Sequence, residues 1–572
     1  MRSFSRNVIP LVLSLVVALN VTAATKSEQI DALLERYNEL RQFNGTILVA
    51  DANGVVHKDG YGFANFEWQI PNTPDVRFRL GSITKQFTST VIMQLVNEGK
   101  LKLDDTITTH LPDYRKDTGD RITITHLLNH TSGIPSYTGM PGFFANESRD
   151  PQVVSEFVKK FASGDLEFEP GSKYAYNNSA YFILGAIIEK LTGKTYAKAL
   201  EERIFEPLAM KHSGYDVSAA IIPKRASGYV ATPDGYRNAP YLDMTIPYAA
   251  GSLYSTVEDL YLWDRALYTE KVLPANLRAQ MFTPGLNDYG FGWVINTAKL
   301  HDDETEVGTV LHGGGIHGFN TLLVRVPERK ELVVLLDNTS SDAKLEEIAM
   351  GAISILRGIP ANPPRASIAQ ELMPYIDDID SAIAHYRELK ASHAADYDFA
   401  ESELNALGYR LLANGLIDDA IEILKLNVEM FPDAANPYDS LGEAYLAAGK
   451  RDLALASYKR SLELNPKNAN AAAAIERLEK PQAEVEAKYP LDAFVGNYPL
   501  APGFVIAITL EDSGLKLQAT GQPKAALRQD AATEFTVVGA PARIVFVMDE
   551  PTGKATSLVL HQGGREMTAK KQ

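Results

Sequence analysis

A repeat in the second half of the chain constrains the fold more than any other feature. Residues 404–437 align with residues 438–470, and three pairs of small or helix-ending residues keep one offset of 34: Gly408 and Gly442, Ala420 and Ala454, Pro432 and Pro466. A period of 34 is typical of a helix–turn–helix unit whose helices cross at small side chains. Such a unit cannot bury its apolar face alone, and about three are needed for a stable array. This part of the chain is therefore predicted to be helical and to pack against its neighbours.

The period and the pattern resemble tetratricopeptide repeats. A degenerate earlier unit is expected at residues 380–393, and we assign residues 373–480 to a short α-solenoid. Two roles stay open for so short an array. It is either a structural spacer or a concave surface that binds a peptide or protein partner.

The repeat also divides the chain. With 572 residues the protein is too long for one domain. The proline-rich stretch 357–367 precedes the repeat and predicts a linker over residues 358–372. Residues 24–357 then form a first domain, and alternating apolar and polar residues predict a small all-β module over residues 487–572.

The N-terminus has the pattern of a secretory signal peptide. Two arginines, Arg2 and Arg6, precede an apolar run from Val8 to Leu19, and small residues follow up to Ala23. We expect cleavage after Ala23, which removes residues 1–23 and places the protein in the periplasm or outside the cell. The alternative is an uncleaved membrane anchor, for which the run is short, because a membrane helix needs about 20 apolar residues. No other stretch is apolar enough to span a membrane.

Composition excludes several functions. The chain has no cysteine, so disulfides, thiolate metal sites and cysteine nucleophiles are excluded. A formal charge of −16 opposes binding to nucleic acid. No zinc-protease or nucleotide-binding motif occurs, and neither a metal nor a cofactor is expected.

The first domain has strand signals at both ends and helical signals between them. An Asn-Gly turn at Asn53–Gly54 indicates a hairpin, and residues 318–327 and 331–340 are strand-like. Apolar residues at helical spacing predict helices over 83–98 and 181–191. This order favours an antiparallel sheet that distant segments close together, an α+β architecture.

The sequence "SITK" places Ser82 three residues before Lys85 at the start of a predicted helix. Side chains at i and i+3 share one helix face, so Lys85 can reach the Ser82 hydroxyl. A lysine with a pKa of about 10.4 is a poor base at neutral pH, however, and needs desolvation or a nearby cation to lose its proton. The alternative is an ordinary helix N-cap at Ser82 with a solvated lysine.

Two further motifs carry polar groups before regular elements. Tyr176 and Asn178 follow a Pro-Gly turn and precede a helix; the alternative is a capping Asn178 and a core-edge Tyr176. His312 precedes three glycines and a strand, and glycine there permits close approach of a ligand to backbone N–H groups. The alternative is a flexible hairpin.

In this order and at these separations, S-x-x-K, Y-x-N and H-x-G resemble the penicillin-binding-protein and class C β-lactamase superfamily of serine hydrolases. Connecting segments such as "ITITHLLNHTSGIPSY" and "PYAAGSLYSTVEDLYLW" resemble that family too, over residues 30–357. The resemblance implies an antiparallel sheet with a helical subdomain.

The resemblance also implies roles. Ser82 would be the acylated nucleophile, Lys85 would help to activate it, and Tyr176 would be the general base, its phenolate favoured by Lys85. Asn178 would hold the substrate amide or the Lys85 ammonium. The third motif supplies the remaining substrate-binding and oxyanion groups: His312, Gly314 and the backbone N–H of Gly315, which would act with that of Ser82.

Two departures shape the expected function. Asn177 stands where the family more often has serine, and His312 stands where a lysine attracts the substrate carboxylate. A histidine is mostly neutral near pH 7. This favours an esterase, amidase or D-amino-acid peptidase that acts on a small molecule or peptide. A β-lactamase or D-alanyl-D-alanine carboxypeptidase proper remains an alternative, as does an envelope interaction protein with a weakly active hydrolase domain.

Other residues of this region are assigned less chemistry. His317 lies close to His312 and is interpreted as a surface histidine flanked by a glycine; the alternative is that it compensates for the missing lysine. His126 and His130 are interpreted as structural. The loop 139–150 carries Met140, Phe143 and Phe144, which either contact an apolar substrate group or cover the loop's own core.

Overall fold

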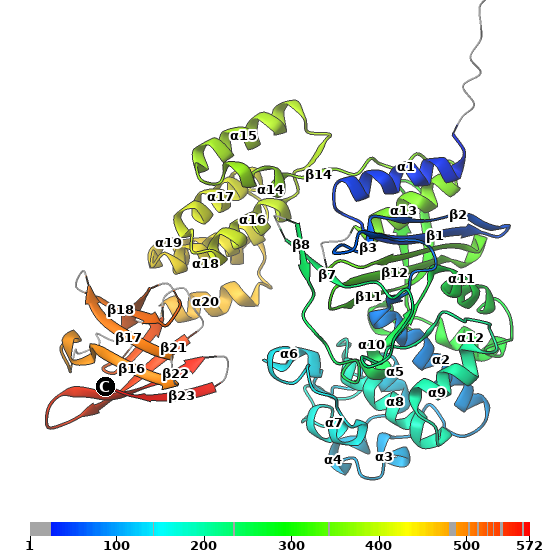
Figure 1. Cartoon of the computed structure of the whole chain (residues 1–572), viewed down its shortest axis with the longest axis horizontal. Helices are drawn as coiled ribbons and strands as arrows, with labels where there is room; N and C mark the ends of the chain where they lie inside the picture. Colours follow the sequence, from blue (N-terminus) through cyan, green and yellow to red (C-terminus); the bar gives the residue numbers. More distant parts are fainter. Residues whose placement is uncertain are drawn as a thin grey trace, which may run out of the picture.

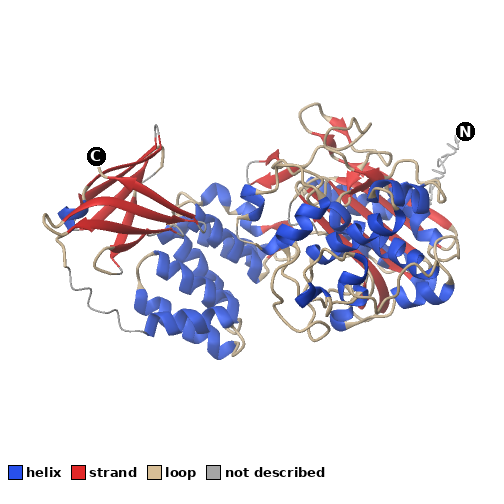
Figure 2. Ribbon diagram, turned by 90° about the horizontal axis from the view of Figure 1, so that it is seen from below, coloured by secondary structure: helices blue, strands red, loops and turns tan. Residues whose placement is uncertain are grey.

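A computed structural model describes residues 24–572, except 141, 233–234, 341–343, 480–487, 502–503, 512–513, 523, 530, 538–541 and 563–564. The predicted signal peptide, residues 1–23, lies outside the described residues. Figures 1 and 2 show three successive groups of elements: a large mixed α and β part, a set of helices and a β-sheet. Within the described ranges, no helix is both long enough and apolar enough to cross a membrane.

The large part is built on a six-stranded sheet in the order β10-β11-β12-β13-β1-β2, with every neighbouring pair antiparallel. The strands are β1 (Gly45–Asp51), β2 (Gly54–Tyr61), β10 (Val294–Lys299), β11 (Glu306–Ile316), β12 (Phe319–Val326) and β13 (Glu331–Asp337). β1 pairs with β13, nearly 300 residues later, with Gly45 opposite Asp337. The predicted antiparallel sheet closed by distant segments is thus present.

Period-two alternation sends successive side chains of the sheet into two cores. On β1, Ile47 and Val49 pack with α1 (Lys26–Glu39) and α13 (Leu345–Leu356) on one face. Leu48 and Ala50 face the other core, which α2 (Thr84–Asn97) and α8 (Asn178–Thr192) complete. Both central helices lie where helical spacing predicted them. Figure 1 shows α1 and α13 on one side of the sheet and the remaining helices of this part on the other.

Short elements surround the second core. The helices are α3 (Ile107–His110), α4 (Lys116–Gly119), α5 (Ile124–Leu128), α6 (Phe143–Asn146), α7 (Val154–Phe161), α9 (Tyr196–Leu200), α10 (Tyr248–Gly251), α11 (Val257–Ala266) and α12 (Ala275–Met281). The short strands are β3 (Phe63–Asn65), β4 (Ile70–Pro71), β5 (Phe78–Arg79), β6 (Gly214–Tyr215), β7 (Tyr229–Thr232), β8 (Gly235–Asn238) and β9 (Leu253–Ser255). A 3-10 turn, η1 (Gly81–Ile83), leads into α2.

The second part is helical. Its helices are α14 (Ile368–Glu371), α15 (Ile379–Ser392), α16 (Glu401–Ala413), α17 (Ile417–Met430), α18 (Ala435–Ala447), α19 (Arg451–Leu464) and α20 (Ala469–Glu479). The aligned glycines lie where paired helices touch: a Cβ on Gly408 would come 2.6 Å from Leu424, and one on Gly442 would come 3.0 Å from Tyr458. The predicted linker also holds α14 and the short strand β14 (Ala366–Ser367), which pairs with β15 (Tyr397–Asp398).

The third part is an eight-stranded antiparallel sheet in chain order. Its strands are β16 (Gly496–Ala501), β17 (Phe504–Glu511), β18 (Gly514–Ala519), β19 (Ala525–Gln529), β20 (Glu534–Val537), β21 (Ala542–Asp549), β22 (Lys554–Gln562) and β23 (Arg565–Lys570). The sheet curls until β23 meets β16, so it is nearly closed like a barrel (Figure 2). Phe494, Phe535 and Phe546 fill its interior with ring contacts of 4.9–5.5 Å between centroids.

Candidate active site

Ser82 lies in the 3-10 turn η1, immediately before α2. The N-cap of α2 is Ile83, and neither η1 nor α2 has a side-chain cap hydrogen bond. The alternative interpretation of Ser82 as an ordinary helix cap is therefore wrong. Its hydroxyl is left available to accept a hydrogen bond from Lys85.

Lys85 is fully buried at the first turn of α2. Its Nζ lies 3.0 Å from Ser82 Oγ, 2.8 Å from Asn178 Oδ1 and 2.9 Å from the Ala250 carbonyl oxygen. No carboxylate in the described part of the chain forms an ion pair with it. Burial therefore lowers the pKa of Lys85 well below its usual range, because nothing compensates for the lost hydration of the ammonium. The solvated lysine considered from the sequence is excluded.

The three contacts also suit a neutral Lys85 amine. Asn178 Oδ1 and the Ala250 carbonyl can only accept, so they match the two N–H groups of an amine. The amine lone pair is then directed at the third partner, the Ser82 hydroxyl, which can donate. This is the geometry of a nucleophile beside its base.

Tyr176 lies just before α8, and Asn178 is the first residue of that helix. The helix cap is Asn177, whose side chain accepts the Ala180 N–H at 2.8 Å. Asn178 therefore does not cap α8 but faces the site, where its amide nitrogen donates to Thr138 at 3.1 Å. The departure from serine at position 177 has a physical reason, since asparagine is among the best N-cap residues.

The Tyr176 ring stands over the same lysine, with 4.8 Å between its centroid and Lys85 Nζ. The residue is 39% exposed, so part of the ring faces solvent, yet the protein packed around it excludes enough water to raise the pKa of Tyr176. The adjacent Ser82 hydroxyl lowers that pKa by a smaller amount. Electrostatics thus favours a neutral phenol at position 176.

Strand β11 forms the opposite wall. The glycines after His312 continue as regular strand to Ile316 and pair with β12, so the hairpin considered from the sequence is present and these glycines lie within its first strand. An added Cβ on Gly314 would lie 2.0 Å from the Leu80 carbonyl oxygen, which explains the glycine there. Gly315 lies beyond the end of the β10 pairing, and its nitrogen is 3.0 Å from the Cβ position of Gly81. Its N–H is therefore beside the nucleophile turn.

His312 is buried and turned away from solvent. Its Nε2 lies 2.9 Å from the Tyr289 hydroxyl, and its Nδ1 lies 2.6 Å from the Gly313 carbonyl oxygen. Nδ1 must donate to that carbonyl, so Nε2 accepts from Tyr289 in the neutral ring. Burial, with a smaller effect from Lys85, lowers the pKa of His312 to about 4. His312 thus carries no charge near pH 7.

A cavity of about 400 Å³ opens over Ser82. Its lining residues are Gly81, Ser82, Tyr137, Thr138, Phe144, Asn178, Leu242, Ile246, Pro247, Ala250, Gly251, Gly315, Ile316, His317, Asn320 and Ser340. No lysine, arginine, aspartate or glutamate is among these described lining residues. The cavity is mainly apolar with a few convergent polar groups, as ligand sites usually are.

The apolar side chains of the loop 139–150 take both roles considered for them: one lines the cavity, and the others cover a core. Phe144 is 41% exposed and lines the cavity, 5.5 Å from the His317 ring. Phe143 is buried against Phe161, with 5.1 Å between ring centroids, and Met140 packs beside the same core. His317, interpreted from the sequence as a surface residue, is half-buried in the cavity wall, and burial lowers its pKa.

Several residues of the site could not be found from sequence reasoning. Ala250 contributes only a backbone carbonyl, for which a sequence carries no signal. Tyr289, the partner of His312, lies in a loop with no periodicity. No group of three or more His, Asp or Glu side chains in the described ranges could hold a metal ion.

A serine and a desolvated lysine, beside a tyrosine and an exposed strand residue, are the kinds of group that serine acyl transfer requires. Comparison with known proteins identifies the family of the chain: residues 30–354 match the family model described as "Beta-lactamase". The chain belongs to the β-lactamase family, whose related amidases, esterases and penicillin-binding proteins are serine hydrolases, and it is an enzyme of that type.

Among curated relatives, "Penicillin-binding protein 4*" of Bacillus subtilis (strain 168) is 31% identical over 362 residues, 59% of this chain and 78% of the relative. Among solved structures, the D-amino acid amidase of Ochrobactrum anthropi SV3 is 25% identical with a TM-score of 0.51, covering 58% of this chain and 99% of that one. An octameric penicillin-binding protein homologue from Pyrococcus abyssi is 21% identical, with a TM-score of 0.50. This match covers 95% of this chain and 99% of the homologue's chain. That likeness in fold extends beyond the family region.

Proposed function

We propose that this protein is an exported serine hydrolase that cleaves an ester or amide bond through an acyl-enzyme on Ser82. The observation that carries the proposal is the environment of Lys85. Its Nζ is 3.0 Å from Ser82 Oγ, it is fully buried, and its other two partners are uncharged acceptors. Because burial lowers its pKa, a lysine held in this way can act as a base closer to neutral pH than a solvated lysine can.

In the proposed reaction, neutral Lys85 takes the proton of Ser82 as Oγ bonds to the substrate's acyl carbon. The carbonyl oxygen becomes an oxyanion, which accepts hydrogen bonds from the backbone N–H groups of Ser82 and Gly315. One such donor contributes about 2.7–4 kcal/mol in other hydrolases. When the tetrahedral intermediate collapses, the leaving group departs with a proton passed from Lys85 by way of the Tyr176 hydroxyl.

Deacylation reverses the proton path. A water molecule gives one proton to the base and bonds to the acyl carbon, and Ser82 leaves as an alcohol after regaining a proton. Because the protein raises the pKa of Tyr176, we assign the base to Lys85 and proton transfer to a neutral Tyr176. This differs from the phenolate base that the family resemblance implied.

We propose that the substrate is uncharged near the scissile bond and carries an apolar group. The described cavity lining has no lysine or arginine, and His312 is neutral, so no fixed positive charge there attracts a carboxylate. The apolar side chains of Phe144, Leu242 and Ile246 offer contact to an acyl or aromatic group instead. β-Lactamase or D-alanyl-D-alanine carboxypeptidase activity is disfavoured for the same reason, because those substrates carry a carboxylate.

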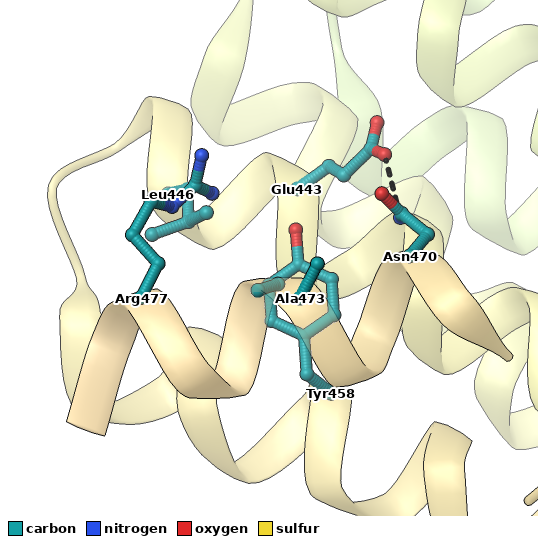
Figure 3. A pocket seen from close by; sticks show the side chains of 7 residues that line it. Glu443, Leu446, Tyr458, Asn470, Ala473 and Arg477 are labelled. Carbon is teal, nitrogen blue, oxygen red and sulfur yellow. Dashed lines mark hydrogen bonds between the residues drawn. The ribbon is translucent and has the colours of Figure 1, made fainter. Parts of the chain in front are cut away.

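We further propose that helices α16 to α20 are tetratricopeptide repeats that bind a peptide or protein partner. The 34-residue offset and the glycines at the helix contacts support this assignment. A pocket of about 540 Å³ lies between α18, α19 and α20 (Figure 3), where Arg477 and Leu446 stand apart from the hydrogen-bonded pair Glu443 and Asn470. The pattern of residues 1–23 supports export to the periplasm or the medium.

The decisive experiment is intact-mass spectrometry of the purified protein after incubation with a fluorophosphonate and, separately, with a penicillin. We expect a fluorophosphonate adduct that Ser82→Ala abolishes and that Lys85→Ala slows strongly. Rapid turnover of the penicillin would instead favour a β-lactamase, and a stable penicillin adduct a carboxypeptidase-like site. Absence of any adduct on folded protein would refute the hydrolase proposal and favour an interaction protein.

A further inference from the structure

His130 lies between α5 and the segment that carries Tyr176, and its backbone is in the left-handed region with φ +61°. A non-glycine residue there is uncommon, although histidine and asparagine are enriched. The side chain is completely buried. Backbone strain at a buried polar residue beside an active site suggests that the conformation serves the site.

Two hydrogen bonds connect His130 to the residues on either side of Tyr176. The Ala175 N–H donates to the His130 carbonyl oxygen at 2.9 Å, and the Asn177 N–H donates to His130 Nδ1 at 3.0 Å. The imidazole also packs on the Tyr176 ring, with 4.3 Å between centroids. One residue therefore fixes the backbone before and after Tyr176 and contacts the ring itself.

The acceptor role defines the state of the imidazole. Nδ1 accepts from Asn177, so the neutral ring carries its proton on Nε2. Tyr181 and Tyr289 pack around the ring at 5.1 and 4.6 Å, and no described carboxylate contacts it. Burial, with the nearby Lys85 and His312, lowers the pKa of His130 well below its usual range, so the acceptor is retained at neutral pH.

We propose that His130 is a positioning residue, which holds Tyr176 and Asn178 against Ser82 and Lys85 by bonding the amides on both sides of Tyr176. The inference rests on the proposed function of Ser82. It goes beyond a structural role because the segment from Ala175 to Asn178 presents two groups to the site: the phenol, and the amide oxygen that accepts from Lys85 at 2.8 Å. A shift of this segment would move both groups together.

Two substitutions separate the hydrogen bond from packing. Asparagine in His130→Asn places an acceptor oxygen near the Nδ1 position and tolerates φ > 0. Leucine in His130→Leu has similar bulk and no acceptor. His126 is a matched control, because it lies in the same stretch of chain and its Nδ1 accepts the Thr123 N–H at 3.2 Å rather than an amide beside Tyr176.

Three measurements are made on the full-length protein: amide hydrogen exchange in peptides that span Tyr174 to Asn178, the rate of fluorophosphonate acylation, and kcat and KM for a p-nitrophenyl ester. For His130→Leu we expect faster exchange there, and acylation and kcat about 100-fold lower, the order that a misplacement of about 1 Å causes. KM should change far less. His130→Asn should restore acylation to within a few-fold of the wild type, and His126→Leu should leave it unchanged.

The outcomes distinguish this inference from the proposed function. Unchanged exchange in His130→Leu would overturn the inference even in a fully active enzyme. Faster exchange with normal acylation would also overturn it, because the held segment would not matter for reactivity. Equal losses in His130→Asn and His130→Leu would show a structural role only. A wild-type protein that fails to react with the fluorophosphonate would refute the proposed function itself.

Discussion

Replacing Gly314 by alanine is expected to slow acylation of Ser82, whereas the same replacement at Gly315 is expected to have little effect. The new methyl carbon at position 314 would lie 2.0 Å from the Leu80 carbonyl oxygen and 2.4 Å from Thr321 Oγ1. Cβ atoms in proteins essentially never come within 3.0 Å of such an atom. To increase the distance from 2.0 to 3.0 Å, β11 and Leu80 must separate by about 1.0 Å.

Leu80 directly precedes the turn that carries Ser82, so this separation moves the nucleophile relative to the Gly315 N–H. A misplacement of about 1 Å costs about 100-fold in rate. Overpacking should also cost about 1–3 kcal/mol of stability. At Gly315 the nearest atom to an added Cβ is Asn320 Oδ1, 3.8 Å away, and alanine keeps the backbone N–H.

The assay is the second-order rate of fluorophosphonate labelling, followed by intact mass, for the wild type and both alanine variants. Thermal unfolding of each variant shows how much protein is folded at the assay temperature. We expect about 100-fold slower labelling for Gly314→Ala and a change within a few-fold for Gly315→Ala. Wild-type labelling by Gly314→Ala, or equal impairment of both variants, would refute the argument that the contact of Gly314 with Leu80 sets the position of the nucleophile.

Three other predictions concern individual side chains of the first domain. Asp264→Ala should lower the free energy of unfolding by about 3–5 kcal/mol, because it leaves the buried Arg325 without the carboxylate that lies 2.6 Å away. Urea denaturation measures this loss, and a loss below about 1 kcal/mol would contradict a strong Asp264–Arg325 ion pair. Phe144→Ala should raise KM for apolar esters with little change in thermal stability, because Phe144 lines the cavity. Phe143→Ala should instead lower the free energy of unfolding by about 3–5 kcal/mol, because Phe143 lies in the core. The reverse pattern would exclude Phe144 from the substrate site. The pKa of His312 is about 4 in the folded protein and about 6.5 in the unfolded chain. As the pH falls, the unfolded chain therefore takes up a proton at His312 before the folded protein does. The free energy of unfolding should fall by up to about 3 kcal/mol between pH 6.5 and pH 4. Urea denaturation across that range should show this part of the loss absent in His312→Gln.

The sheet and the helices behind the site could be predicted because their signals are periodic. Alternation on both sides of Asn53–Gly54 indicated the β1–β2 hairpin, and helical spacing indicated α2 and α8. The distance between Ser82 and Lys85 followed from the same periodicity, since i and i+3 share a helix face. What periodicity could not show was burial, and burial alone separates a base from a solvated lysine.

Other parts of the site depend on tertiary contacts that leave no local pattern. The sequence offered Asn177 and Asn178 as adjacent asparagines, and only the path of the chain assigns the cap to the first and the Lys85 contact to the second. Phe143 and Phe144 are also adjacent, yet one packs in the core and the other lines the cavity. His130 was interpreted from the sequence as structural, and its contacts with the segment of Tyr176 could not be predicted, because its partners lie about 45 residues further along the chain.

The charge balance of the site connects the base to the substrate. Lys85 has three hydrogen-bond partners and no carboxylate among them, so desolvation alone sets its protonation state. A carboxylate within about 4–6 Å would favour the ammonium and remove the base that Ser82 requires. An anionic group of the substrate placed close to Lys85 would do the same, since no cation lines the described cavity to hold it elsewhere. We infer that the proposed preference for an uncharged substrate and the proposed activation of the nucleophile have one physical origin, the absence of fixed charge around Lys85.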